Sequence, residues 1–163
     1  MKRVLIILLF KLIPLLTNGQ DAKWNHDKVS EIDSVFREAL TYFIIEMDSS
    51  FGKVTKSEET KILFLEYQNY LRNIPNFISG YEIHPVGPGN YQGVFKQNKN
   101  RLPLIKVSPL TLEDGSFKIT FTLCNAHLEG KKSLNLALSH WIIIYFNFKD
   151  GHLVYQKTEK GGI

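Results

Sequence analysis

The sequence predicts an α+β fold, in which two N-terminal helices pack on a mainly antiparallel, twisted or curved sheet of about six strands. Between residues 27 and 74, apolar side chains recur every three or four positions, as they do on one face of a helix. After Pro75 the period changes to two, as along half-buried strands. The 163 residues are 44% apolar and 22% charged, which is typical of one globular domain.

The first nineteen residues have the layout of a secretory signal peptide. Lys2 and Arg3 precede an apolar stretch from Val4 to Leu16, and small or polar residues follow it before Gln20. The apolar stretch is shorter than the roughly 20 residues that span a bilayer. We therefore expect cleavage before Gln20, a single mature domain over 20–163 with no transmembrane segment, and export to a bacterial periplasm or to the medium. An uncleaved interfacial anchor and a buried first strand are the alternatives.

The expected mature chain is nearly neutral, with 17 basic and 16 acidic residues. Nucleic-acid binding usually needs a clear basic excess, so the composition disfavours a nucleic-acid partner. Cys124 is the single cysteine, and the chain can therefore form no internal disulfide.

Residues 27–48 are expected to form the first helix, with Asp27 in its first turn, where a negative charge is favourable. Its apolar side chains fall on one face. They are Val29, Ile32, Phe36, Leu40, Phe43 and Met47.

Residues 56–74 are expected to form the second helix. Thr55 and Glu58 have the spacing of a capping box, and Pro75 forbids continuation. A short loop would join the two helices into an antiparallel hairpin over 27–74.

The sheet is expected over 77–157, with a short tail at 158–163. Pro103 predicts an edge or bulged strand at 101–107. The run from Trp141 to Phe146 is apolar on both faces, which predicts an interior strand at 134–148. The expected strands are 77–84, 91–97, 101–107, 117–124, 134–148 and 152–157, with residues 98–100 as a hairpin link between the second and the third.

His140 is the most informative histidine of the sequence. Strict alternation puts it on one face with Leu134, Leu136, Leu138, Ile142 and Ile144. A polar ring on an apolar face needs a partner, and a core histidine with a satisfied hydrogen bond is the simple interpretation. The alternative is a ligand pocket, because such pockets set a few polar groups among apolar walls. Trp141, Tyr67 and Tyr70 are the aromatic candidates for its walls.

Four basic residues are expected on one hairpin, beside Tyr91 and Phe95. They are Lys96, Lys99, Arg101 and Lys106. They are candidates for anion binding, although lysines also protect an edge strand from aggregation.

Catalytic and metal-binding patterns are weak. Cys124 and His127 form a close Cys–His pair, but an unpaired thiol is the simpler interpretation. The five histidines show no metal-ligand spacing, so no metal and no cofactor are predicted.

These observations favour an exported, non-enzymatic module that binds an unidentified small molecule or protein. The alternative function is a small pocket enzyme of the hydrolase or isomerase type, with His140 as its acid or base. A cavity of several hundred Å³ beside His140, with a carboxylate in reach, would favour the enzyme.

Overall fold

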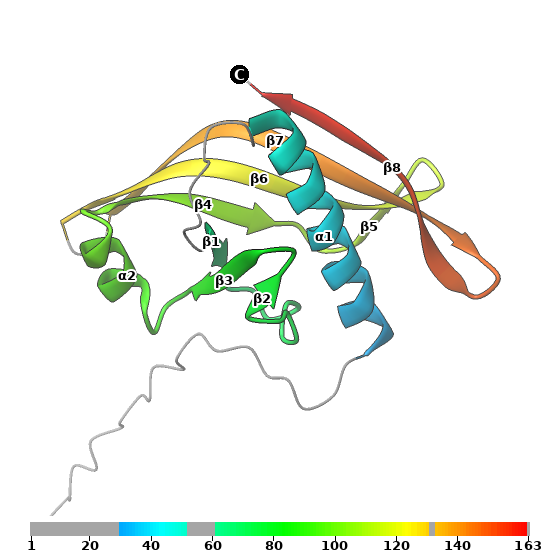
Figure 1. The fold of residues 1–163 in the computed structure, drawn as a ribbon, viewed down its shortest axis with the longest axis horizontal. Coiled ribbons are helices and arrows are strands. Elements are labelled where there is room, and N and C mark those ends of the chain that lie inside the picture. Colours follow the sequence, from blue (N-terminus) through cyan, green and yellow to red (C-terminus); the bar gives the residue numbers. More distant parts are fainter. Residues whose placement is uncertain (1–29, 52–60, 131–132, 163) are drawn as a thin grey trace, which may run out of the picture.

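The computed structural model describes residues 30–51, 61–130 and 133–162. Within them the chain forms two helices and one eight-stranded sheet (Figure 1). The elements are α1 (Glu31–Phe51), β1 (Lys61–Glu66), β2 (Phe77–Ile78), β3 (Tyr81–Val86), α2 (Tyr91–Gln97), β4 (Arg101–Val107), β5 (Thr111–Glu113), β6 (Ser116–Glu129), β7 (Ser133–Lys149) and β8 (His152–Gly162).

The sheet runs in the order β2-β3-β1-β4-β6-β7-β8, and β5 pairs with β6 outside this path. Strand β1 is parallel to both of its neighbours, and the other pairs are antiparallel. The α+β class and the mainly antiparallel sheet are therefore confirmed. The expected strand number of about six is wrong, and so is the placement of both helices at the N-terminus, because α2 lies between β3 and β4.

Helix α1 confirms the first predicted helix with different ends. Ser30 caps it reciprocally with Asp33: the Ser30 amide and hydroxyl donate to the carboxylate, and the Asp33 amide donates back to the hydroxyl. The helix thus begins after Ser30 rather than at 27, and it continues to Phe51 rather than ending at 48. Asp27 and Val29, like the expected signal peptide and the Thr55–Glu58 capping box, lie outside the described residues.

The predicted second helix over 56–74 is wrong in its described part. Residues 61–66 form β1, which lies between two parallel neighbours. Strands with parallel neighbours often consist of continuous apolar runs, which Ile62–Leu65 provide, with Leu63 and Leu65 buried and Ile62 exposed. Residues 67–76 follow as turns and loop, so the helical hairpin over 27–74 does not form.

The segment predicted as a strand at 91–97 is helix α2. Tyr91, Val94 and Phe95 have helical spacing, and Phe95 is fully buried. Asn90 fixes the preceding turn, because its side chain accepts from the Gly87 amide and donates to a carbonyl. Residues 98–100 therefore connect a helix to β4 and are not a hairpin link.

The predicted strand at 77–84 is two strands. A two-residue turn at Ser79–Gly80, with φ of 50° and 86°, reverses the chain between β2 and β3. The strand predicted at 117–124 is confirmed and continues as β6 to Glu129.

Strand β4 is an interior strand, which contradicts the edge position predicted from Pro103. It pairs with β6 along its whole length and with β1 at Leu104 and Ile105. The Leu128 amide donates to the Asn100 carbonyl. Because hydrogen-bonded and non-hydrogen-bonded positions alternate along an antiparallel pair, this bond shows which residues of β4 direct their backbone groups towards β6. At Pro103 the backbone nitrogen points away from β6, so the missing N–H removes no β4–β6 hydrogen bond. Pro103 also precedes Leu104, where the pairing with β1 begins.

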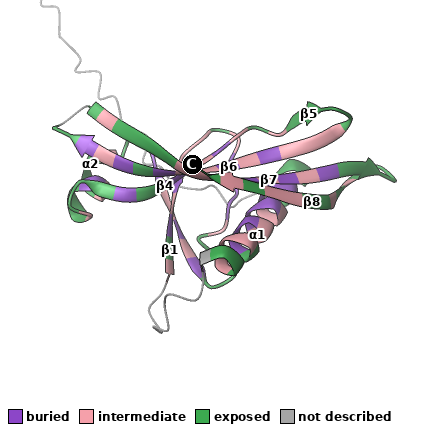
Figure 2. Cartoon of the chain, turned by 90° about the horizontal axis from the view of Figure 1, so that it is seen from above, coloured by how far each residue is buried: buried purple, intermediate pink, exposed green. Residues whose placement is uncertain are grey.

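Helix α1 crosses one face of the sheet near its middle, and α2 covers part of the other face at one end (Figures 1 and 2). The α1 face carries the larger core, which includes Ile105, Val107, Ile119, Phe121, Ile142 and Ile144. The α2 face carries a second core, in which Phe95 packs with Val86, Leu102, Leu104, Ala126 and Leu128.

Strand β7 lies between β6 and β8, so the interior strand predicted at 134–148 is confirmed. Strand β8 continues to Gly162, so the predicted tail at 158–163 is strand as far as that residue.

Candidate functional site

A hollow of about 420 Å³ lies where the C-terminal end of α1 meets β7 and β8. The apolar part of its wall is Trp141 and Ile142, two glycines of β8 also line it, and its polar side chains are a histidine, a lysine and a serine. The lining residues are Ser50, His140, Trp141, Ile142, Lys160, Gly161 and Gly162.

Two glycines let β8 pass close to the aromatic rings of β7. A Cβ atom at Gly161 would stand 2.4 Å from Trp141 Cζ2, and one at Gly162 would stand 2.7 Å from His140 Cδ2. His140 pairs with Gly162 and Trp141 with Gly161 across the strands. The rings therefore occupy the space that side chains on β8 would otherwise fill, and the hollow opens beside them.

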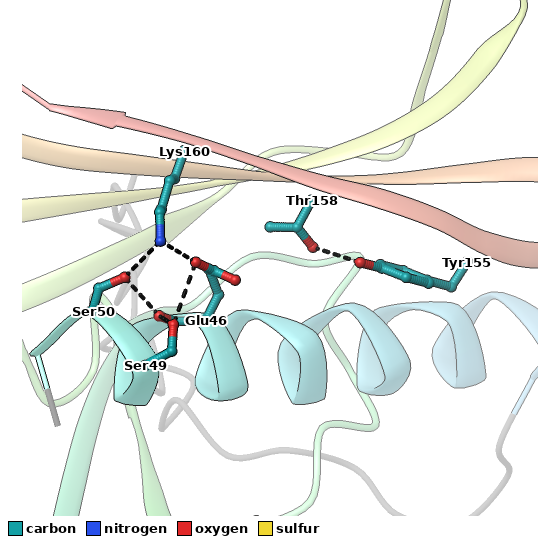
Figure 3. A network of polar contacts seen from close by, with 6 residues as sticks. All are labelled: Glu46, Ser49, Ser50, Tyr155, Thr158 and Lys160. Carbon is teal, nitrogen blue, oxygen red and sulfur yellow. Dashed lines mark hydrogen bonds and ion pairs between the residues drawn. The ribbon is translucent and has the colours of Figure 1, made fainter.

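Lys160 fixes the end of α1 against β8 (Figure 3). Its ammonium donates to the Glu46 carboxylate and, at 3.0 Å, to the Ser50 hydroxyl. The last turn of α1 holds no basic residue, so Lys160 supplies the positive charge that stabilises a helix C-terminus. One wall of the hollow is thus held by contacts between α1 and β8.

A β-bulge at Ser139 determines which way His140 points. Cys124 pairs with Leu138 and Leu123 pairs with His140, so Ser139 is the extra residue, and its hydroxyl donates to the Leu123 carbonyl. The bulge moves His140 to the α1 face.

The predicted shared face is therefore correct only for the residues after the bulge. His140 lies with Ile142 and Ile144, as expected, but not with the three leucines Leu134, Leu136 and Leu138, which lie on the α2 face. Leu136 and Leu138 are 40% and 43% exposed. His140 itself is more than half buried.

The hollow brings together His140 and Trp141 but not the two predicted tyrosines. Tyr70 follows β1, stacks on Phe36 and donates to the Val107 carbonyl at 2.6 Å. Tyr67 packs against the same core. Both tyrosines pack in the α1 core and not in the hollow. They lie on the loop after β1, where the sequence predicted a second helix.

The four predicted basic residues do not share a hairpin. Lys96 is on α2, Lys99 is in the turn after it, and Arg101 begins β4. Lys106 lies five residues further along β4, on the opposite face, 3.8 Å from Glu66. The first three are near one another in the chain, and Lys106 is separated from them.

Cys124 and His127 lie on opposite faces of β6, three residues apart in an alternating strand. Burial raises the pKa of the Cys124 thiol, which disfavours the reactive thiolate. The geometry thus supports the interpretation of Cys124 as a packed thiol and not as part of a dyad.

The histidines at strand ends lie apart. His84 contacts Glu82 at 2.7 Å, and His152 contacts Glu31 at 3.2 Å. Among residues 30–51, 61–130 and 133–162, no group of three His, Cys, Asp or Glu side chains could hold a metal ion.

Two other hollows and several lining residues are not foreseen from the sequence. One, of about 530 Å³, lies between β4 and β6 at Arg101, Pro103, Asn125 and His127, and the other lies at the β5–β6 turn. Of the residues around His140, only the Gly161–Gly162 pair carries a sequence signal, since adjacent glycines in a strand mark a close approach. Ser50 and Lys160 come from separate elements and show no pattern.

A comparison with protein-family models and one with curated proteins find no match for this chain. In the described part of the chain, no helix combines the length and the apolarity that a membrane crossing requires.

Proposed function

We propose that this protein is a non-enzymatic binding module that holds a small, largely apolar ligand in the hollow beside His140 and Trp141. The observation that carries the proposal is the hollow itself. It combines apolar walls from Trp141 and Ile142 with a few polar groups at His140, Lys160 and Ser50. This combination is typical of small-molecule sites.

The contacts that Lys160 makes at the edge of the hollow favour a neutral ligand. Lys160 is already paired with Glu46 and hydrogen-bonded to Ser50, so its charge is largely compensated. A ligand with an apolar body and a hydrogen-bonding group would use the apolar walls and leave this ion pair in place.

A fluorescence titration with the neutral dye N-phenyl-1-naphthylamine tests the proposal. We expect saturable binding to one site. Ser50→Phe places a ring into the hollow and should lower the affinity at least about tenfold. Ser49→Phe is the matched control, because Ser49 is the preceding residue of α1 and does not line the hollow. Unsaturable fluorescence, or equal affinities for the two variants, would refute the proposal.

A pocket enzyme with His140 as acid or base is the second candidate, and the volume of the hollow favours it. A general base is most effective with an acid that orients it. Glu46, an acid beside this wall, is engaged by Lys160 and Ser49. His140→Leu separates the two functions: a binding module keeps most of its affinity for the dye, whereas an enzyme loses all turnover.

Export is part of the proposal and rests on the residues before Gln20. The purified native protein should begin at about Gln20 by mass spectrometry, and an intact Met1 would contradict cleavage.

A further inference from the structure

The α2 face of the sheet carries a second pocket, which includes Tyr145 of β7. A pocket of about 240 Å³ lies against the β5–β6 turn. It is lined by Glu113, Asp114, Ser116, Lys118, Tyr145, Gln156 and Lys157. Its volume is below the roughly 300–1,000 Å³ of sites for drug-sized molecules, so it fits one ring-sized unit.

A tight turn and a bulge build this pocket from four strands, β5 to β8. Asp114 and Gly115, with φ of 51° and 77°, form the two-residue turn between β5 and β6. Tyr145 pairs with Lys157 while the next residue of β7 pairs with Tyr155, so Gln156 is the extra residue of a bulge in β8. The Gln156 side chain reaches Ser116 of β6, whose hydroxyl donates to it at 3.3 Å.

Both lysines of the pocket are already paired with carboxylates. Lys118 contacts Glu113, and Lys157 contacts Glu159 at 2.5 Å. An anionic ligand would have to displace these carboxylates and would also meet Asp114, whereas a cationic ligand would meet two lysines. The pocket instead offers ammonium, amide, hydroxyl and carboxylate groups in close alternation, which suits a neutral ligand whose hydroxyls both donate and accept hydrogen bonds.

Tyr145 gives this polar pocket an aromatic wall. Its hydroxyl donates to Glu159 at 3.0 Å, and Lys157 Nζ lies 4.7 Å from the ring centroid. Burial and the contact with Glu159 raise the pKa of Tyr145, so the phenol stays protonated. The ring is thereby held in a fixed orientation on the sheet.

An apolar strip continues from the pocket along the same face. Ile143 and Trp141 precede Tyr145 by two and four residues, and side chains two apart in a strand share a face. Trp141 and Tyr145 are therefore about 13 Å apart along β7. A ligand longer than one ring would leave the pocket over Ile143 towards Trp141.

We propose that this pocket and strip bind a neutral oligosaccharide, with one sugar ring in the pocket against Tyr145 and further rings along β7. The inference rests on the Lys118–Tyr145–Gln156 group, which contributes nothing to the hollow beside His140, and the two sites share only Trp141 at the far end of the strip.

Calorimetric titrations with the neutral hexasaccharides cellohexaose, maltohexaose and xylohexaose, and with the matching trisaccharides, test this inference. At least one hexasaccharide should bind, and more tightly than its trisaccharide. Because the ligand is neutral, the affinity should change little between low and high salt. The absence of binding by all three at millimolar concentration would overturn the proposal. So would binding only of a sulfated oligosaccharide that salt abolishes.

Three variants locate the site. Tyr145→Ala should weaken binding about tenfold. Gln156→Ala, at an exposed position, should weaken it about fivefold and keeps the test valid if Tyr145→Ala fails to fold. Phe148→Ala is the control, because Phe148 is an exposed aromatic side chain of β7 on the opposite face. Unchanged affinity in Gln156→Ala, or an equal loss in Phe148→Ala, would contradict the placement.

Discussion

Two adjacent glycines determine how closely β8 approaches the rings of β7. A methyl group at Gly161 would overlap Trp141, whereas one at Gly93 of α2 would meet no atom within 4 Å. Replacing glycine by alanine should therefore change the free energy of unfolding in opposite directions at Gly161 and Gly93.

We expect Gly161→Ala to lower the free energy of unfolding by about 1–3 kcal/mol through overpacking. Gly93→Ala should raise it by about 0.5–1 kcal/mol, because alanine favours the helix. Urea unfolding followed by circular dichroism measures both. Equal effects would show that the Trp141 ring does not lie against Gly161.

Asp33 links the start of α1 to the loop after β1. Burial alone raises the pKa of its carboxyl group, but hydrogen bonds from Ser30 and Asn73, with the nearby Arg37, outweigh burial and lower it. A lowered pKa in the folded state stabilises the fold above the ordinary value of 3.8. This stabilisation is lost as the pH falls below 3.8 through the lower pKa of the folded state.

We therefore expect the free energy of unfolding to fall on acidification below about pH 4, and to fall less steeply in Asp33→Asn. Urea midpoints measured from pH 7 to pH 2.5 check this. Parallel curves for the two proteins would remove Asp33 from the acid response.

The sequence pattern predicts helix α1 and the interior position of β7 well. Phe36, Leu40 and Phe43 of α1 are buried as their spacing predicts, and the run after Trp141 correctly predicts an interior strand. Strand β1 could not be distinguished from a buried helix, because four consecutive apolar residues fit both.

The bulges escape periodicity for a different reason. One extra residue at Ser139 reverses the facing of every side chain before it, and nothing in the sequence around Ser139 marks this. The sequence therefore could not predict that His140 and the leucines lie on opposite faces. Nor could it predict the Gln156 bulge that shapes the second pocket.

Hydrogen exchange should rank the strands by their position in the sheet. Amides at 141–146 have a paired strand on each side, whereas β8 is paired on one side among the described residues. We expect 141–146 to exchange more slowly than 153–157. Faster exchange at 141–146 would contradict an interior β7.

The whole molecule is one curved sheet with a core on each face (Figure 2). Helix α1 closes the larger core, and α2 closes the smaller one. The first proposed site lies where α1 ends, beside His140, and the second lies along β7 on the α2 face, away from α2.

The most direct test of the proposed function is a titration of the ¹⁵N-labelled protein with N-phenyl-1-naphthylamine, followed by NMR. The dye should shift the amide resonances of Ser50, of residues 140–142 and of residues 160–162, and leave those of 101–103 and 125–127 at the other large hollow unchanged. Shifts concentrated at 101–103 and 125–127, or spread evenly over the sheet, would contradict a binding site beside His140.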